Sequence, residues 1–76
     1  MKDLVAFLAR ELVENPDEVR VTQVEGEKSI ILELRVAQSD MGKVIGRQGR
    51  VAKALRTVVK AAAPKGGKLV HLEIVD

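Results

Sequence analysis

The spacing of hydrophobic residues changes several times along the chain, and each change marks a predicted element. Apolar side chains first recur every three or four residues from Leu4 to Leu12, with charged residues between them, which predicts an amphipathic helix. The Asn15-Pro16 pair ends this helix, because a residue before proline disfavours helical backbone angles.

Apolar and polar residues alternate in the next part of the chain. In the run VRVTQVEG at 19–26, Val19 and Val21 alternate with polar residues. In the run SIILELRVA at 29–37, apolar residues recur at positions 30, 32, 34 and 36. A short turn of Gly26, Glu27 and Lys28 joins them, so we expect a β-hairpin with one face toward water. The run LVHLEIV at 69–75 alternates in the same way and predicts a third strand.

Between the hairpin and the last strand the helical spacing returns. A brief helix is predicted at roughly 41–45, with Ser39 or Asp40 as its cap. After a glycine loop, a longer helix is predicted at 50–63, and Pro64 ends it. On a helical wheel one arc of about 100° holds the apolar residues Val51, Ala54, Leu55, Val58 and Ala62. Its basic residues fill a separate arc of about 120°; they are Arg50, Lys53, Arg56 and Lys60.

The order helix, strand, strand, short helix, loop, longer helix, strand predicts one α+β domain over residues 1–76. Because the strands are amphipathic, we expect a three-stranded sheet with three helices on one face. The other face then meets water or a partner. A chain of 76 residues buries only about 60% of its unfolded surface, so a compact layered fold or a partner is expected.

The composition excludes several classes of protein. There is no cysteine, so disulfides and thiolate metal sites are excluded, and we expect no metal and no cofactor. The apolar runs are too short to insert in a membrane, and the charged residues of the N-terminal segment do not fit a signal peptide. A cytoplasmic location is therefore expected.

The net charge is only +2, but the charges are unevenly distributed. Residues 1–40 carry 5 Lys/Arg and 9 Asp/Glu, a net charge of −4, whereas residues 41–76 carry 8 and 2, a net charge of +6. No acidic residue lies between Met41 and Lys68. A segment of this length whose charged residues are all positive indicates a surface that binds polyanions.

The run KVIGRQGR at 43–50 holds two glycines separated by two residues. A P-loop needs four residues between its glycines and a Lys-Ser/Thr pair after them, and a dinucleotide-binding fingerprint needs a different glycine spacing directly after a strand. Both motifs are absent. The remaining interpretation is a helix–G-x-x-G–helix clamp on a nucleic-acid backbone, because glycines admit sugar and phosphate close to the main chain.

The sequence VIGRQGR resembles the I-G-x-x-G core of the KH domain, a single-stranded nucleic-acid-binding module whose loop clamps about four nucleotides. The element order is similar to the type II, bacterial form. The segment DMGKVIGRQGRVAKALRTVVKAAA is similar to the small bacterial single-KH RNA-binding proteins of the KhpA family. The resemblance implies that the two strands joined by the helix pair run parallel.

The predicted RNA-binding residues have three roles. By the resemblance, the clamp is formed by residues 46–49, and an apolar floor for bases by Val44 and Ile45. Basic side chains around the loop attract phosphates. The full predicted set is Lys43, Val44, Ile45, Gly46, Arg47, Gln48, Gly49, Arg50 and Lys53.

The predicted function is binding and not catalysis. No nucleophile or paired acid and base is apparent, and His71 is expected on the surface. With one aromatic residue, Phe7, the chain lacks a platform for base stacking, so weak sequence preference is expected. We expect a single-stranded RNA-binding protein that acts as a post-transcriptional regulator or RNA chaperone. The alternative is a protein-interaction module that forms a homodimer, or a heterodimer with a larger KH-containing protein, through Phe7, Ile31 and Leu69.

Overall fold

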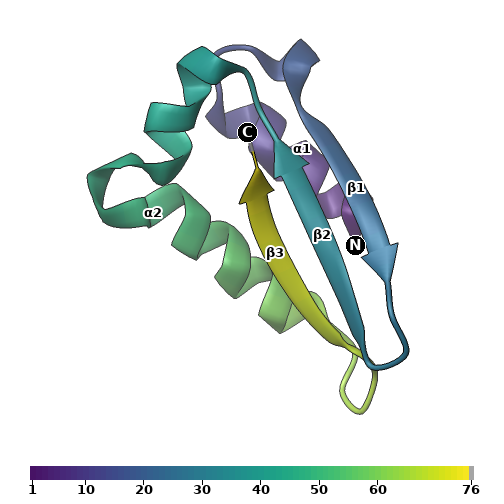
Figure 1. The fold of residues 1–76 in the computed structure, drawn as a ribbon. Helices are drawn as coiled ribbons and strands as arrows, with labels where there is room; N and C mark the ends of the chain where they lie inside the picture. The colour runs from purple at the N-terminus through teal and green to yellow at the C-terminus, as the bar shows by residue number, and fades with distance from the viewer. Residues whose placement is uncertain (76) are drawn as a thin grey trace.

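The computed structural model describes residues 1–75, except for the side chains of Arg47 and Gln48. The predicted α+β class and the order helix, strand, strand, helix, helix, strand are confirmed, the two arms of the long helix being counted separately (Figure 1). The elements are α1 (Lys2–Leu12), the 3₁₀ turn η1 (Pro16–Glu18), β1 (Arg20–Glu25), β2 (Ser29–Arg35), α2 (Gln38–Ala62) and β3 (Leu69–Val75).

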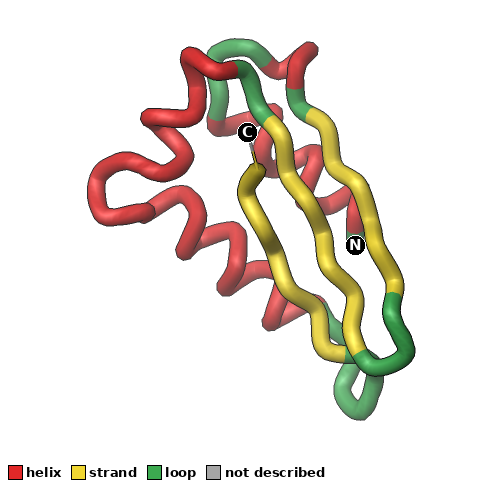
Figure 2. Tube along the Cα trace, viewed as in Figure 1, coloured by secondary structure: helices red, strands yellow, loops and turns green. Residues whose placement is uncertain are grey.

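The three strands form one mixed sheet in the order β1-β2-β3 (Figure 2). β1 and β2 pair antiparallel, and the Gly26 N–H donates to the Ser29 carbonyl at 2.8 Å across the turn, so the predicted hairpin is confirmed. β2 and β3 pair parallel, as the resemblance implied. Parallel neighbours need a long crossover, and α2 supplies it on the face that α1 also covers.

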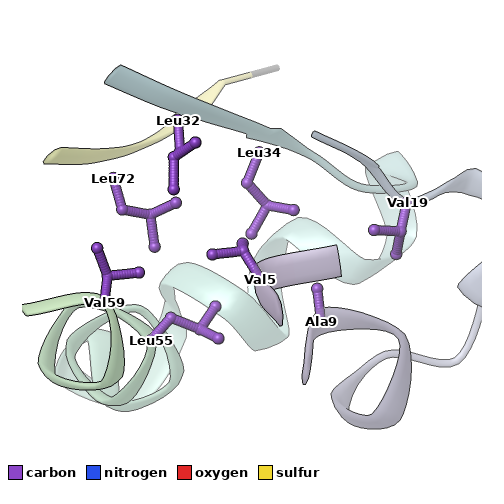
Figure 3. Close-up of a cluster of buried hydrophobic side chains, with 8 residues drawn as sticks. All are labelled: Val5, Ala9, Val19, Leu32, Leu34, Leu55, Val59 and Leu72. Carbon is purple, nitrogen blue, oxygen red and sulfur yellow. The ribbon is translucent and has the colours of Figure 1, made fainter. Parts of the chain in front are cut away.

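The core lies between the sheet and the helices. Leu32, Leu34 and Leu72 point from the sheet toward the helices, and all three are buried (Figure 3). α1 contributes Val5 and Ala9 to the same cluster, and α2 contributes two larger side chains from its second half. The alternation along the strands therefore predicted correctly which face is covered. The core cluster is Val5, Ala9, Val19, Leu32, Leu34, Leu55, Val59 and Leu72.

α2 turns a sharp corner where the sequence has its glycine loop. Helical structure runs from Gln38 to Ala62, but Gly49 has a φ of +68°, which a straight right-handed helix cannot contain. Figure 1 shows the ribbon bending there into two arms. We call 38–45 the first limb, Gly46–Gly49 the corner, and 50–62 the second limb.

The start of α2 differs from the prediction in two ways. The first limb begins at Gln38, three residues before the expected start at Met41. Its N-cap is Ala37, which makes no side-chain capping bond, so the predicted cap at Ser39 or Asp40 is wrong. Asp40 lies in the first turn of the helix and its carboxylate faces a different segment of the chain, as described below.

Candidate nucleic-acid interface

The corner of α2 exposes two glycines whose immediate surroundings are open. Apart from neighbours along the helix, a side-chain carbon added to Gly46 or Gly49 would meet no described atom within 4 Å. Gly49 requires glycine because its φ is positive. Gly46 has no positive φ, and packing does not exclude the methyl group of alanine there. The fold itself therefore gives no reason for glycine at 46, whereas a ligand that approaches the backbone does.

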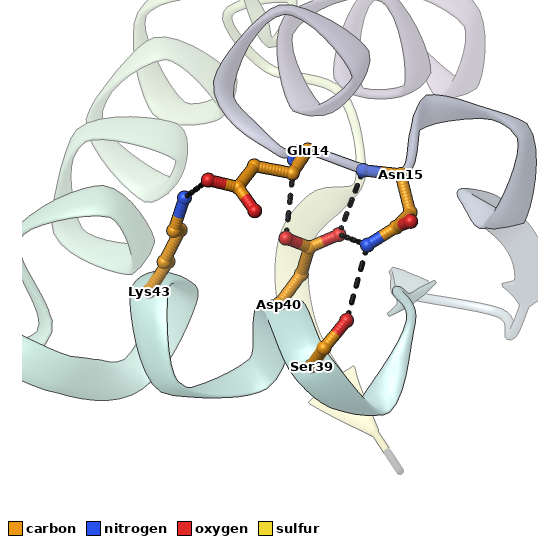
Figure 4. A network of polar contacts seen from close by, with 5 residues as sticks. All are labelled: Glu14, Asn15, Ser39, Asp40 and Lys43. Atoms are coloured by element: carbon orange, nitrogen blue, oxygen red, sulfur yellow. Dashed lines mark hydrogen bonds and ion pairs between the residues drawn. The ribbon is translucent and has the colours of Figure 1, made fainter.

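The first limb is fixed to the end of α1 by the buried carboxylate of Asp40, which is 1% exposed (Figure 4). Its Oδ1 accepts the Glu14 backbone N–H at 3.1 Å, and its Oδ2 accepts the Asn15 backbone N–H and the Asn15 Nδ2–H at 3.0 Å each. Asn15 Nδ2 also donates to Ser39 Oγ at 3.0 Å. Four hydrogen bonds thus set the direction in which the first limb approaches the corner.

The same hydrogen bonds determine the charge state of Asp40. Burial of the carboxyl acts to raise its pKa, but the N–H groups of Glu14 and Asn15 stabilise the carboxylate, and the pKa is lowered below its usual value. The anchor is therefore charged at neutral pH. Sequence reasoning missed this role, because Asp40 and its partners are 25 and 26 residues apart.

Val44 and Ile45 point in different directions. Val44 is 2% exposed and packs in the interior, so the prediction that its side chain forms part of an exposed apolar floor is corrected. Ile45 is 52% exposed next to the corner and is available for apolar contact. Val44 holds the first limb in place, and only Ile45 of this pair presents its side chain to solvent.

Lys43 is engaged by an acidic residue from the first half of the chain. Its Nζ forms an ion pair with Glu14 Oε1 (Figure 4). The side chains are 50% and 74% exposed, so the pair is weak and can exchange for another anion. The sequence, with its separate acidic and basic halves, gave no sign of this contact across 29 residues.

The second limb presents an exposed row of cations, which we call the basic stripe: Arg50, Lys53, Arg56 and Lys60. Arg50 and Lys53 stand closest to the corner, where the positive end of the second limb also lies. Farther along, Arg56 Nε donates to the Leu72 carbonyl at 3.4 Å and so lies over β3. The side chains of Arg47 and Gln48 lie outside the described part of the chain, and their predicted contacts stay a prediction.

Metal ligands and membrane-spanning helices are two features that residues 1–75 do not show. No group of three metal-ligating His, Cys, Asp or Glu side chains occurs among the described residues. In the same part of the chain, no helix combines the length and apolar character that a membrane crossing requires. His71 is exposed on the outer face of the sheet, as predicted.

Sequence comparison relates the chain to a known family. The model of the KhpA/KhpB KH domain matches residues 2–74. The chain belongs to this family. Similar proteins include the RNA-binding protein KhpA of Clostridium acetobutylicum, 63% identical over 75 residues, which are 99% of this chain and 100% of that protein. The protein of the same name from Aquifex aeolicus is 55% identical over 76 residues, 100% and 96% of the two chains.

The similarity extends to relatives of lower sequence identity. RNA-binding protein KhpA of Chlamydia pneumoniae is 43% identical over 76 residues, covering 100% of this chain and 97% of that protein. No solved structure matches the chain significantly. The predicted membership of the KhpA family is thus confirmed over essentially the whole described length.

Proposed function

We propose that this KH domain binds single-stranded RNA by clamping the sugar-phosphate backbone at the corner Gly46–Gly49. The observation that carries the proposal is the open space in front of Gly46, at a position where neither φ nor packing requires glycine. The names of the similar KhpA proteins support RNA as the ligand.

Each part of the interface has a distinct task in this proposal. Phosphates approach the corner, where the positive end of the second limb and the side chains of Arg50 and Lys53 attract them. Ile45 provides the apolar contact for a base. Lys43 joins after it releases Glu14. Because most of these contacts address the backbone, sequence preference is weak, which suits a post-transcriptional regulator or RNA chaperone in the cytoplasm.

The experiment is fluorescence anisotropy with a labelled pool of single-stranded RNA, at several salt concentrations. If about three phosphates are neutralised, log affinity falls with log salt at a slope near −2, at about −0.7 per phosphate for single strands. The variant Arg47→Asp/Gln48→Asp is expected to abolish binding, because three units of charge are lost at the clamp.

The matched control is Lys2→Glu/Gln38→Glu, which changes the net charge by the same three units. Both substitutions lie in the first turn of a helix, where negative charge is favourable, so the fold is retained. The control is expected to keep most of the affinity. Equal weakening by both variants would contradict a clamp at the corner and would leave only a general attraction between RNA and a basic protein.

A second function, self-association or pairing with a larger KH-containing protein, is favoured by exposed apolar side chains. Phe7 on α1 is 59% exposed and Leu69 on β3 is 67% exposed, whereas Ile31 is half-buried in the middle strand. We infer that Phe7 and Leu69 are the better candidates for protein contact. Sedimentation at two concentrations tests the homodimer, and a monomer mass at both would refute it.

A further inference from the structure

The two outer edges of the three-stranded sheet are not equally protected. β3 has the second limb of α2 beside it, and the Leu72 carbonyl accepts a hydrogen bond from Arg56 Nε at 3.4 Å. β1 is the other edge strand, and among residues 1–75 no strand lies beyond it (Figure 2). Five of its six residues are exposed, and only Val21 is half-buried. The edge of β1 is therefore open to a further strand.

The hydrogen-bond pattern of the hairpin shows which backbone groups of β1 face this open edge. The Gly26 N–H donates to the Ser29 carbonyl at 2.8 Å, so the two residues form a hydrogen-bonded pair of the antiparallel ladder. Such pairs alternate with pairs whose N–H and C=O groups point away from the partner strand. In the register of β1 and β2, the residues that point away are Val21, Gln23 and Glu25. In the described part of the chain, the backbone groups of these three residues make no hydrogen bond to another segment.

β1 also lacks three features by which proteins block an exposed edge. Its sequence RVTQVE contains neither proline nor lysine, and its six residues pair with β2 without a bulge. One edge carbonyl is blocked, that of Val19, which accepts from Arg20 Nη1 at 3.0 Å, but it lies just before the strand. On the outer face, Thr22 and Val24 are exposed and β-branched, so they can pack beside the side chains of an added strand.

The two ends of this edge are acidic. Asp17 and Glu18 directly precede β1, and Glu25 and Glu27 lie at its other end; all four side chains belong to exposed residues. This stretch holds four acidic residues and one basic residue, a net charge of −3. Lys68 neutralises Glu25, but no ion pair within residues 1–75 involves the other three. A strand that adds to β1 is therefore attracted if it carries basic side chains.

We propose that the free edge of β1 binds an extended basic segment of a partner protein, which joins the sheet as a fourth strand. Main-chain hydrogen bonds to Val21, Gln23 and Glu25 supply the affinity, and the acidic residues at both ends of β1 favour basic side chains. The inference does not depend on RNA binding, because β1 and the basic stripe lie at opposite edges of the sheet. RNA and the partner can then be bound at the same time.

The test uses a synthetic heptapeptide that alternates lysine and valine, blocked at both ends, and measures amide hydrogen exchange of the protein by NMR. At saturating peptide, the N–H groups of Val21, Gln23 and Glu25 should exchange at least about tenfold more slowly, because they acquire acceptors. The N–H groups of Thr22 and Val24 already bond to β2 and should change less. A heptapeptide that alternates glutamate and valine should bind at least about tenfold more weakly.

Two substitutions at one position separate the edge from the fold. Gln23→Pro removes the central N–H donor of the edge, and it should retain the fold because that N–H points away from β2. Gln23→Thr keeps the N–H and is the matched control. Affinity for the basic peptide should fall by at least about tenfold in Gln23→Pro and change by less than about twofold in Gln23→Thr. Thermal denaturation establishes that both variants are folded.

Three results would overturn the proposal: no binding of the basic peptide to the wild type at about 1 mM, equal binding of the acidic peptide, or equal binding of the basic peptide by folded Gln23→Pro. If Gln23→Pro does not fold, the exchange rates of the wild type decide. Slower exchange at Val21, Gln23 and Glu25 supports strand addition at β1, whereas unchanged exchange at these three residues refutes it.

Discussion

Replacement of Gly46 by alanine separates the stability of the fold from the proposed binding of RNA. The added methyl group meets no described atom within 4 Å, and the φ of Gly46 is not in the left-handed region. Alanine also restricts the unfolded chain more than glycine does. The substitution should therefore stabilise the protein by between about 0.5 and 1 kcal/mol, which raises Tm by about 2 to 8 °C in a domain of this size.

The same methyl group occupies the space that the RNA backbone needs. If a phosphate hydrogen-bonds to the main chain at the corner, alanine displaces it and removes at least one charge-assisted hydrogen bond, a loss of about 1.5 to 3 kcal/mol. That loss weakens binding by about 10- to 150-fold. Gly46→Ala is thus expected to increase stability and to decrease affinity, a combination that simple unfolding cannot produce.

Two further glycines supply the controls. Gly42 lies one helical turn before Gly46 and also has open surroundings, so Gly42→Ala should raise Tm similarly and keep RNA affinity. Gly49→Ala forces alanine into a φ of +68° and should lower stability by about 1 to 2 kcal/mol. Thermal denaturation and RNA anisotropy are measured on all three variants. A Gly46→Ala protein that is folded and binds RNA within about twofold of the wild type would refute backbone approach at this position.

Three other predictions concern the Asp40 carboxylate, the ion pair of Lys43 with Glu14, and the hydrophobic core. Asp40→Asn should lower Tm by roughly 10 °C at pH 7, since it replaces a charged acceptor of three hydrogen bonds. Because the folded pKa of Asp40 is lowered, its contribution is present above the unfolded pKa and is lost as pH falls through the folded value, so the Tm difference should narrow below about pH 4. Glu14→Gln should raise RNA affinity by about twofold, because it releases Lys43, and should change Tm little. Unchanged RNA affinity would show that Lys43 does not contact RNA. Leu32→Ala should cost about 2 to 5 kcal/mol in urea denaturation, and a smaller loss would contradict its place in the core.

Periodicity alone predicted most of the fold. The alternation in β2 and β3 determined which face the helices cover, since Leu32 and Leu72 had to be buried together. The helical spacing placed Leu55 in the core correctly, but Val59 is buried although it lies outside the predicted apolar arc, and Val58 of that arc is exposed. Local pattern is sufficient here because each element buries one face, and one arrangement in layers covers all of these faces.

The sequence pattern did not predict the location or partner of a side chain where these depended on contacts between distant segments. Val44 and Ile45 are both apolar and adjacent, so only the packing of the first limb decides that Val44 is inside. Asp40 has the properties of a helix cap by sequence, yet its carboxylate binds N–H groups of Glu14 and Asn15 instead. The sequence predicts a free cation at Lys43, but the fold brings the carboxylate of Glu14 beside it. Each case concerns a polar or exposed group whose partner the local sequence does not specify.

These contacts also explain how a chain of only 76 residues can keep an open corner. The first limb is held from the inside by Val44 and from the side by Asp40, so neither support lies on the surface that the proposed RNA would occupy. Because these two residues support the first limb, the fold does not depend on Gly46. The lack of a side chain at Gly46 can then be explained by access for the ligand. Stability and binding are then carried by different residues of the same helix, and substitutions at Asp40 and at Gly46 should change the two properties independently.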